Sequence, residues 1–265
     1  MARVRQLGLA PALKALVLGS SLTLDAESRR QTELTKNQTA WLLLSVLIVA
    51  LCGIAYELII AAVSSYLLGN SVAQFSITIG LFMFAMGIGS YLTKFIHEQL
   101  VERFIQIEIA VALVGGLSAA LLFVVFPYYA LYKPVMYGLI LLIGTLVGLE
   151  IPLLTRILSR SASFSESLAH VLSLDYIGAL IGSVSFPLLL LPSLGLFRSS
   201  FAIGLLNISV AVIALTMFGT SHPTVRSYWK YALLVMGILL AALFASGLIT
   251  QFAEGQLFAD EMIYS

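Results

Sequence analysis

Carboxylates inside long apolar stretches are the residues of this sequence with the clearest chemical potential. Glu57 interrupts the apolar run 41–68, and Glu150 and Asp175 lie inside later apolar runs. A charge at this depth costs about 3 kcal/mol on insertion scales, so such side chains usually face a partner or a wet cavity. Carboxylates in that position bind cations or carry protons. The sequence therefore suggests a site for a cationic ligand, with these candidate residues: Glu57, Glu150, Asp175, Tyr56 and Tyr176.

A purely structural role is the alternative for most of the charges. Several acidic and basic residues fall near the same predicted ends of the apolar runs, where ion pairs would hold neighbouring helices together. This predicted structural charge cluster contains Lys94, Arg103, Glu108, Arg156 and His170. Glu57 lies away from it and is the acid least easily explained by local pairing. Both interpretations remain open at this point.

Familiar motifs of soluble enzymes and metal sites are absent from the sequence. It contains no HExxH, GxSxG or Walker loop, and Gly87-x-Gly89 falls inside an apolar run. His97, His170 and His222 are scattered and Cys52 is the single cysteine, so no metal site is expected. The net charge of +1 offers no basic face for a nucleic-acid partner.

The elements that must position these residues are membrane-length helices. Hydrophobic residues make up 60% of the chain and charged residues 10%, against about 25% charged in soluble domains. An apolar helix of about 20 residues crosses a bilayer. The sequence thus predicts an all-α, polytopic membrane bundle of about seven transmembrane helices. The predicted spans are 41–67, 74–94, 105–126, 135–155, 168–192, 200–218 and 230–250.

Three regions follow from this pattern. Residues 1–39 form a polar N-terminal segment, in which 11–24 could lie as an amphipathic helix at the membrane surface. Residues 40–250 form the membrane domain. Residues 251–265 are expected to be a linker toward a C-terminal soluble domain that is missing from the chain.

Orientation follows from the positions of lysine and arginine, which favour the cytoplasmic side. With the N-terminus inside, only Lys133 and Arg198 of the 14 basic residues fall outside. The cytoplasmic set is Arg3, Arg5, Lys14, Arg29, Arg30, Lys36, Lys94, Arg103, Arg156, Arg160, Arg226 and Lys230. An odd number of spans then puts the C-terminus outside.

Pairs of small residues four positions apart predict close helix packing. Gly144 and Gly148 form one such pair, and Gly178 and Gly182 another. In lipid, where the solvent is as apolar as the side chains, close backbone approach helps helices associate. Glu150 is not on the face of the first pair, so it is expected to meet a different neighbour.

The order of short motifs resembles a known family. The sequence reads Gly53-Ile-Ala-Tyr-Glu57, then Gly148-Leu-Glu-Ile-Pro152, then Leu174-Asp-Tyr-Ile-Gly178. This resembles the membrane domain fused upstream of bacterial spermidine synthase-like (aminopropyltransferase-like) domains. The resemblance implies a bacterial inner-membrane location and a following soluble domain of methyltransferase fold, whose opening the segment 260–265 resembles. The family's cofactor loop and transfer residues are absent here, so no cofactor and no catalysis are expected of this chain alone.

The function expected from these observations is that of an integral membrane domain. It would anchor and position a C-terminal methyltransferase-fold domain and bind a cationic ligand through its acids. A small-solute or cation transporter and a structural subunit of a membrane complex are the alternatives. The expected partners are the lipid bilayer, the soluble domain or a separate partner protein, and a second copy of the chain.

Overall fold

The computed structural model describes residues 34–219 and 223–247, and this part of the chain is all-helical, as the sequence predicts. The expected interfacial helix at 11–24 and the linker at 251–265 lie outside the described residues. The long helices are α2 (Lys36–Leu68), α3 (Ser71–Leu92), α4 (Leu100–Val125), α5 (Tyr129–Leu158), α6 (Phe164–Ser185), α7 (Leu191–Phe218) and α9 (Trp229–Phe244). Short helical segments are η1 (Thr93–Phe95), η2 (Phe186–Leu190) and α8 (Pro223–Arg226).

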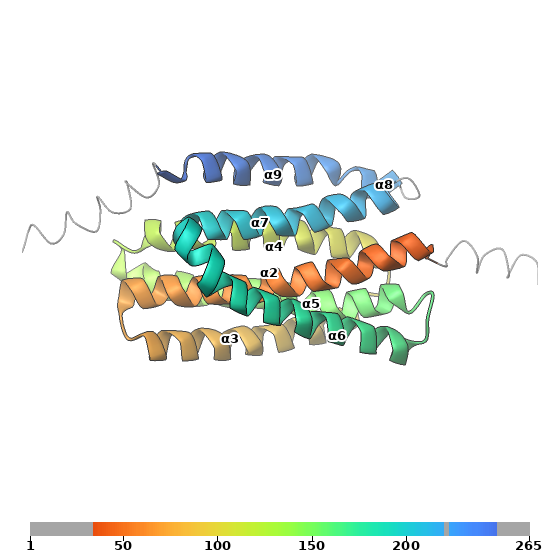
Figure 1. Ribbon diagram of the computed structural model, residues 1–265, viewed down its shortest axis with the longest axis horizontal. Helices are drawn as coiled ribbons and strands as arrows, with labels where there is room; N and C mark the ends of the chain where they lie inside the picture. Colours follow the sequence, from red (N-terminus) through yellow and green to blue (C-terminus); the bar gives the residue numbers. More distant parts are fainter. Residues whose placement is uncertain (1–33, 220–222, 248–265) are drawn as a thin grey trace, which may run out of the picture.

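The predicted count of seven separate spans is wrong. Five helical runs are long and apolar enough to cross a membrane, and Trp229–Phe244 is a shorter sixth. The predicted spans 168–192 and 200–218 belong to one continuous run, Phe164–Phe218. The chain bends within this run at the π-helical η2, and Gly195 there adopts a left-handed backbone with φ +73°. Gly195 leaves helical geometry, and α6 and α7 run in opposite directions in Figure 1, so the chain turns back on itself within this run.

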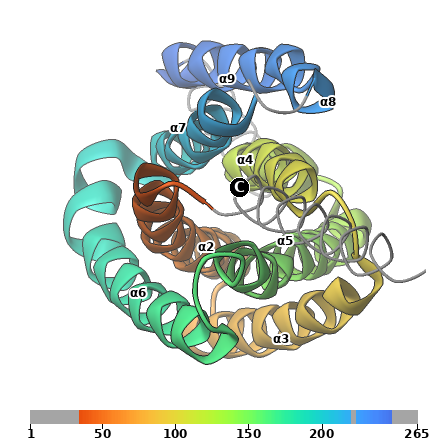
Figure 2. The same cartoon turned by 90° about the vertical axis from the view of Figure 1, so that its right-hand side faces the viewer.

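The bundle is built around α2. This helix packs against α3, α4, α5, α6 and α7, and Figure 2 shows these neighbours surrounding it. In Figure 1, α2 and α5 run in opposite directions, while α6 runs in the same direction as α2. A central helix is buried on most of its surface, so a polar residue in its middle must face another helix or an internal cavity.

Glycines allow the closest helix contacts. A Cβ on Gly144 of α5 would lie 2.8 Å from the Ala85 Cβ of α3, and a Cβ on Gly148 would meet the Met86 carbonyl oxygen. A Cβ on Gly182 of α6 would lie 2.7 Å from the Leu51 carbonyl oxygen of α2. The two small-residue pairs therefore form close helix contacts, as predicted.

Basic residues of the described part gather mainly at one end of the bundle. Helices α3 and α5 end at the same side where α2, α4 and α6 begin (Figure 1). The charges at this end, called the basic end below, are Lys36, Lys94, Arg103, Arg156, Arg160, Arg226 and Lys230. Lys133 and Arg198 lie toward the other end. The bacterial inner-membrane location, and the side of the membrane that each end would face, stay predictions.

Candidate functional site

An acid-lined cavity of about 170 Å³ lies between α2, α3, α5 and α6. Glu57 of α2, Glu150 of α5 and Asp175 of α6 all line it. Its apolar lining residues are Val46, Val49, Ala50, Gly53, Ile54, Phe82, Met86, Val147, Ile151, Leu154 and Ala179. The structure thus brings together the three acids that the sequence singles out, although they are far apart along the chain.

The acids are spread along the length of this cavity. Gly53 stands beside Val147, because a Cβ on Gly53 would lie 3.0 Å from Val147 Cγ1. Glu57 lies four residues after Gly53 on α2, which is further from the basic end. Glu150 lies three residues after Val147 on the antiparallel α5, which is closer to the basic end. A rise of 1.5 Å per residue therefore separates the Cα atoms of Glu57 and Glu150 by roughly 10 Å along the bundle.

Asp175 continues this order beyond Glu150. Gly178 of α6 packs against Leu47 and Ala50 of α2. Because α6 runs parallel to α2, Asp175 lies one turn further toward the basic end. The sequence of acids along the cavity is therefore Glu57, Glu150, Asp175.

The cavity is strongly acidic for its surroundings. Within 34–219 and 223–247, no lysine, arginine or histidine lines it. Glu57 and Glu150 are 4% and 1% exposed, and neither carboxyl oxygen of Glu150 has a hydrogen-bond partner in the described part of the chain. An unpaired buried carboxylate costs several kcal/mol, so these groups favour a bound cation or a proton.

A second polar layer stands behind Glu150, away from the cavity. Asn207 of α7 donates from Nδ2 to Glu108 Oε2 over 3.0 Å and to the Glu108 carbonyl oxygen over 3.0 Å. The carboxyl group of Glu108 is in turn a direct neighbour of the Glu150 carboxyl group. Glu108 Oε1 and Asn207 Oδ1 have no partner within the described residues. Sequence reasoning missed Asn207, although an amide in the apolar stretch 200–218 is itself a signal of a buried polar contact.

The two tyrosines proposed for the site lie outside the cavity lining. Tyr176 is 69% exposed on α6. Tyr56 is fully buried, and its ring packs against α4, where a Cβ on Gly115 would lie 2.7 Å from it. Each is next in sequence to a cavity acid, but neighbouring helix positions point about 100° apart.

The five residues of the predicted structural charge cluster do not form one group. Lys94 stacks over the rings of Tyr91 and Phe95. Arg103 donates to Gln106 over 2.9 Å.

The remaining members of that set lie elsewhere. Arg156 donates to the backbone carbonyl oxygens of Thr93 and Ile96, which ties the end of α5 to η1. Glu108 contacts Asn207, and His170 lines a different pocket near the start of α6. Among the described residues, no three His, Cys, Asp or Glu side chains are grouped as a metal site would require. The absence of a metal stays a prediction.

The described part of the chain is an all-helical bundle with an internal acid-lined cavity. Comparison with known proteins identifies relatives of this chain. A polyamine aminopropyltransferase of Leptospira interrogans is 42% identical over 228 residues, which cover 86% of this chain and 46% of the relative. Polyamine aminopropyltransferase 2 of Ralstonia nicotianae is 46% identical over 233 residues, 85% of this chain and 46% of the relative. Polyamine aminopropyltransferase 1 of Streptomyces coelicolor is 38% identical over 237 residues. No protein-family model and no solved structure matches the chain.

These relatives confirm the resemblance to aminopropyltransferases and correct the function expected from it. The chain spans about half the length of the curated relatives it matches. Because proteins that align with about 85% of the chain are named as transferases, the expectation of an anchoring, transport or purely structural function is wrong. The charges and apolar helices suggested those functions, but they describe where a protein lies and not what it does.

Proposed function

We propose that this chain forms part of a polyamine aminopropyltransferase and that its acid-lined cavity binds a linear polyamine. The observation that carries the proposal is the row of Glu57, Glu150 and Asp175 along one cavity, which no basic residue of the described part of the chain lines. Aminopropyl transfer joins an aminopropyl group to an amine, so its substrates and products are aliphatic chains with positively charged nitrogens. The reaction is inferred from the names of the relatives, and the cavity is the proposed binding site for the amine substrate.

The chemistry of the cavity suits such a molecule. Ammonium groups form charge-assisted hydrogen bonds with carboxylates. The methylene groups between them would contact apolar side chains such as Ile54, Phe82 and Val147. Acids whose Cα atoms are spaced over roughly 10 Å along the cavity can each meet a different nitrogen of one extended chain.

The helices belong in a lipid bilayer under this proposal. Large apolar side chains are exposed on the outside of the bundle, among them Leu180 at 63%, Leu188 at 68% and Phe244 at 86%. Water would make this surface unfavourable, whereas lipid tails suit it. We propose a bacterial inner-membrane location with the basic end in the cytoplasm. The proposed partners are the lipid bilayer, a C-terminal soluble domain or a separate partner protein, and a second copy of the chain.

Equilibrium binding of radiolabelled spermidine to the detergent-purified chain tests the cavity. The variants Glu57→Gln, Glu150→Gln and Asp175→Asn keep side-chain size while removing one charge each. Glu166→Gln is the matched control, because Glu166 is an exposed acid on the same helix as Asp175. We expect saturable binding to the unaltered chain, weakened by each cavity variant and unchanged in the control.

Two results would count against the proposal. Binding that is equally strong in all four variants would separate the polyamine from this cavity. No saturable binding of any polyamine to a chain that melts cooperatively would remove the polyamine site altogether.

A further inference from the structure

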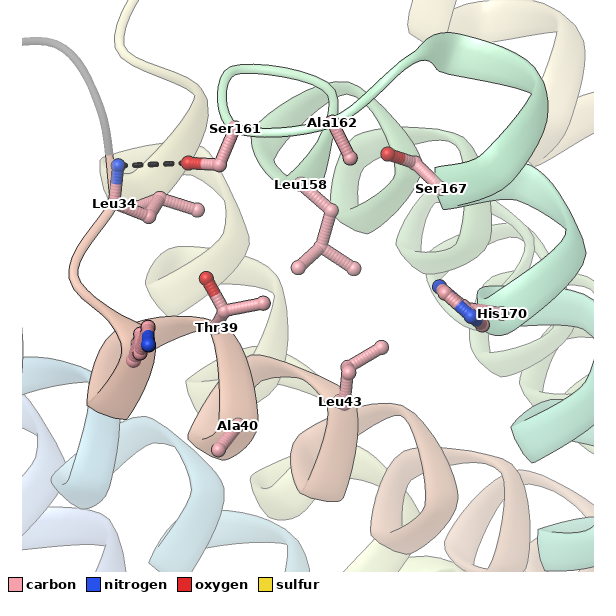
Figure 3. Close-up of a pocket in the computed structure, with 10 residues that line it drawn as sticks. Leu34, Thr39, Ala40, Leu43, Leu158, Ser161, Ala162, Ser167 and His170 are labelled. Atoms are coloured by element: carbon pink, nitrogen blue, oxygen red, sulfur yellow. Dashed lines mark hydrogen bonds between the residues drawn. The ribbon is translucent and has the colours of Figure 1, made fainter.

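A second and larger pocket, of about 500 Å³, opens where α2 and α6 begin and α5 ends. It lies at the basic end of the bundle, apart from the acid-lined cavity. Figure 3 shows side chains from these three elements converging on it. Its lining includes Lys36, Leu43, Leu158, Ser161, Ser167 and His170.

Hydrogen-bond donors in this pocket lack acceptors. Ser161 Oγ accepts the Leu34 backbone N–H over 2.8 Å, which leaves the hydroxyl hydrogen of Ser161 free to donate. Ser167 is only 2% exposed, and its Oγ has no partner within the described residues. Figure 3 shows this oxygen directed into the pocket. A buried hydroxyl without a partner costs free energy that a ligand oxygen would recover.

Positive electrostatic potential adds to these donors. Lys36 lines the pocket, and among the described residues no aspartate or glutamate does. The helices α2 and α6 both begin here, at the caps Thr35 and Ser163, and helix N-termini carry partial positive charge. Glu166, in the first turn of α6, is the described acid nearest in sequence to Ser167. Its side chain is exposed and does not line the pocket. The pocket therefore suits an anionic oxygen group, opposite in charge preference to the acid-lined cavity.

We propose that this pocket binds the phosphate of an anionic phospholipid headgroup. The phosphate oxygens would accept from Ser161, Ser167 and Lys36. The apolar part of the lining, including Leu43 and Leu158, would contact the glycerol and the first methylenes of the acyl chains. A free phosphate shares the polar contacts but leaves this apolar lining without a partner. The proposal does not depend on polyamine binding, because it uses different residues and a ligand of opposite charge.

Thermal stability of the detergent-purified full chain tests this proposal with three probes at equal ionic strength. The probes are short-chain phosphatidylglycerol, short-chain phosphatidylcholine and inorganic phosphate. We expect phosphatidylglycerol to raise the melting temperature in a saturable way, phosphatidylcholine to raise it much less, and phosphate to have little effect. A rise from phosphate equal to that from phosphatidylglycerol would overturn the lipid as the source and indicate a soluble phosphate ligand.

Substitutions of pocket residues test whether the phospholipid binds in this pocket. Lys36→Gln and Ser167→Ala should each weaken the apparent affinity for phosphatidylglycerol, by about fivefold for the lysine. Lys133→Gln is the control, since Lys133 is an exposed lysine of α5 toward the opposite end. Loss of affinity in the pocket variants but not in the control supports the site. Equal affinity in all variants, or equal rises from both lipids, would overturn it.

Discussion

Asn207 of α7 and Glu108 of α4 are joined by a 3.0 Å hydrogen bond in the middle of the bundle. The same amide also donates to the Glu108 backbone carbonyl oxygen. This double contact holds the Glu108 carboxyl group beside Glu150, whose other side lines the acid-lined cavity. The cavity wall is thus supported by a polar contact that joins two other helices.

Replacing Asn207 with alanine should destabilise the bundle. The change removes the donor to a carboxyl group that is fully buried, and an unsatisfied buried polar group costs about 1–3 kcal/mol, with more for a charged one. Thermal unfolding in detergent measures the loss. Ser173→Ala removes the hydroxyl of an exposed residue on α6 and should leave stability unchanged. An unaltered melting temperature for Asn207→Ala would show that the Asn207–Glu108 contact carries no stability.

Alanine at Gly148 should destabilise the contact between α3 and α5. Its Cβ would run into the Met86 carbonyl oxygen, so the helices must separate, and overpacking of this kind costs typically 1–3 kcal/mol. Gly138→Ala on the same helix is the matched control, because no atom lies within 4 Å of its added Cβ. That control should be neutral or stabilising by up to about 1 kcal/mol, from helix propensity. Equal melting temperatures for the two variants would contradict the close approach of these helices.

Removing the Glu57 charge should affect long polyamines more than short ones. The Glu57 Cα lies roughly 10 Å along the bundle from the Glu150 Cα, on the side away from Asp175, so we expect a short diamine held by Glu150 and Asp175 not to reach it. We expect Glu57→Gln to weaken spermidine binding by about tenfold, or about 1.4 kcal/mol, and to leave 1,3-diaminopropane nearly unchanged. Competition against radiolabelled spermidine measures both affinities. A similar loss of affinity for both amines would mean that the acids do not discriminate between ligands of different length.

Introduced cysteines should report which end of the bundle faces the cytoplasm. Cys52 is the single cysteine and is fully buried, so it provides an unreactive background. A membrane-impermeant maleimide should label Lys133→Cys in intact cells, and Arg160→Cys only after the cells are opened. The reverse pattern would invert the orientation, and labelling of both sites in intact cells would contradict a bilayer location.

Much of the fold could be predicted from local sequence. Long apolar runs indicate helices because a buried backbone in an apolar environment must satisfy its own hydrogen bonds. The small-residue pairs at 144 and 148 and at 178 and 182 indicated close contacts, and the structure contains them. The number of spans could not be predicted in this way. The stretches 168–192 and 200–218 are predicted as two spans, whereas the structure joins them in one apolar run that turns back near η2 and Gly195.

Sequence by itself determined that this chain is helical, apolar and supplied with acids at costly positions. Tertiary structure decided which of those acids line the same cavity. Glu57, Glu150 and Asp175 share a cavity, whereas Tyr176, one residue after Asp175, is exposed on the outside of the bundle. The physical reason is that a helix apolar on all sides has no polar face to show which side turns inward. Its rotation is set by close contacts such as that of Gly178 with α2, and only the assembled bundle contains them.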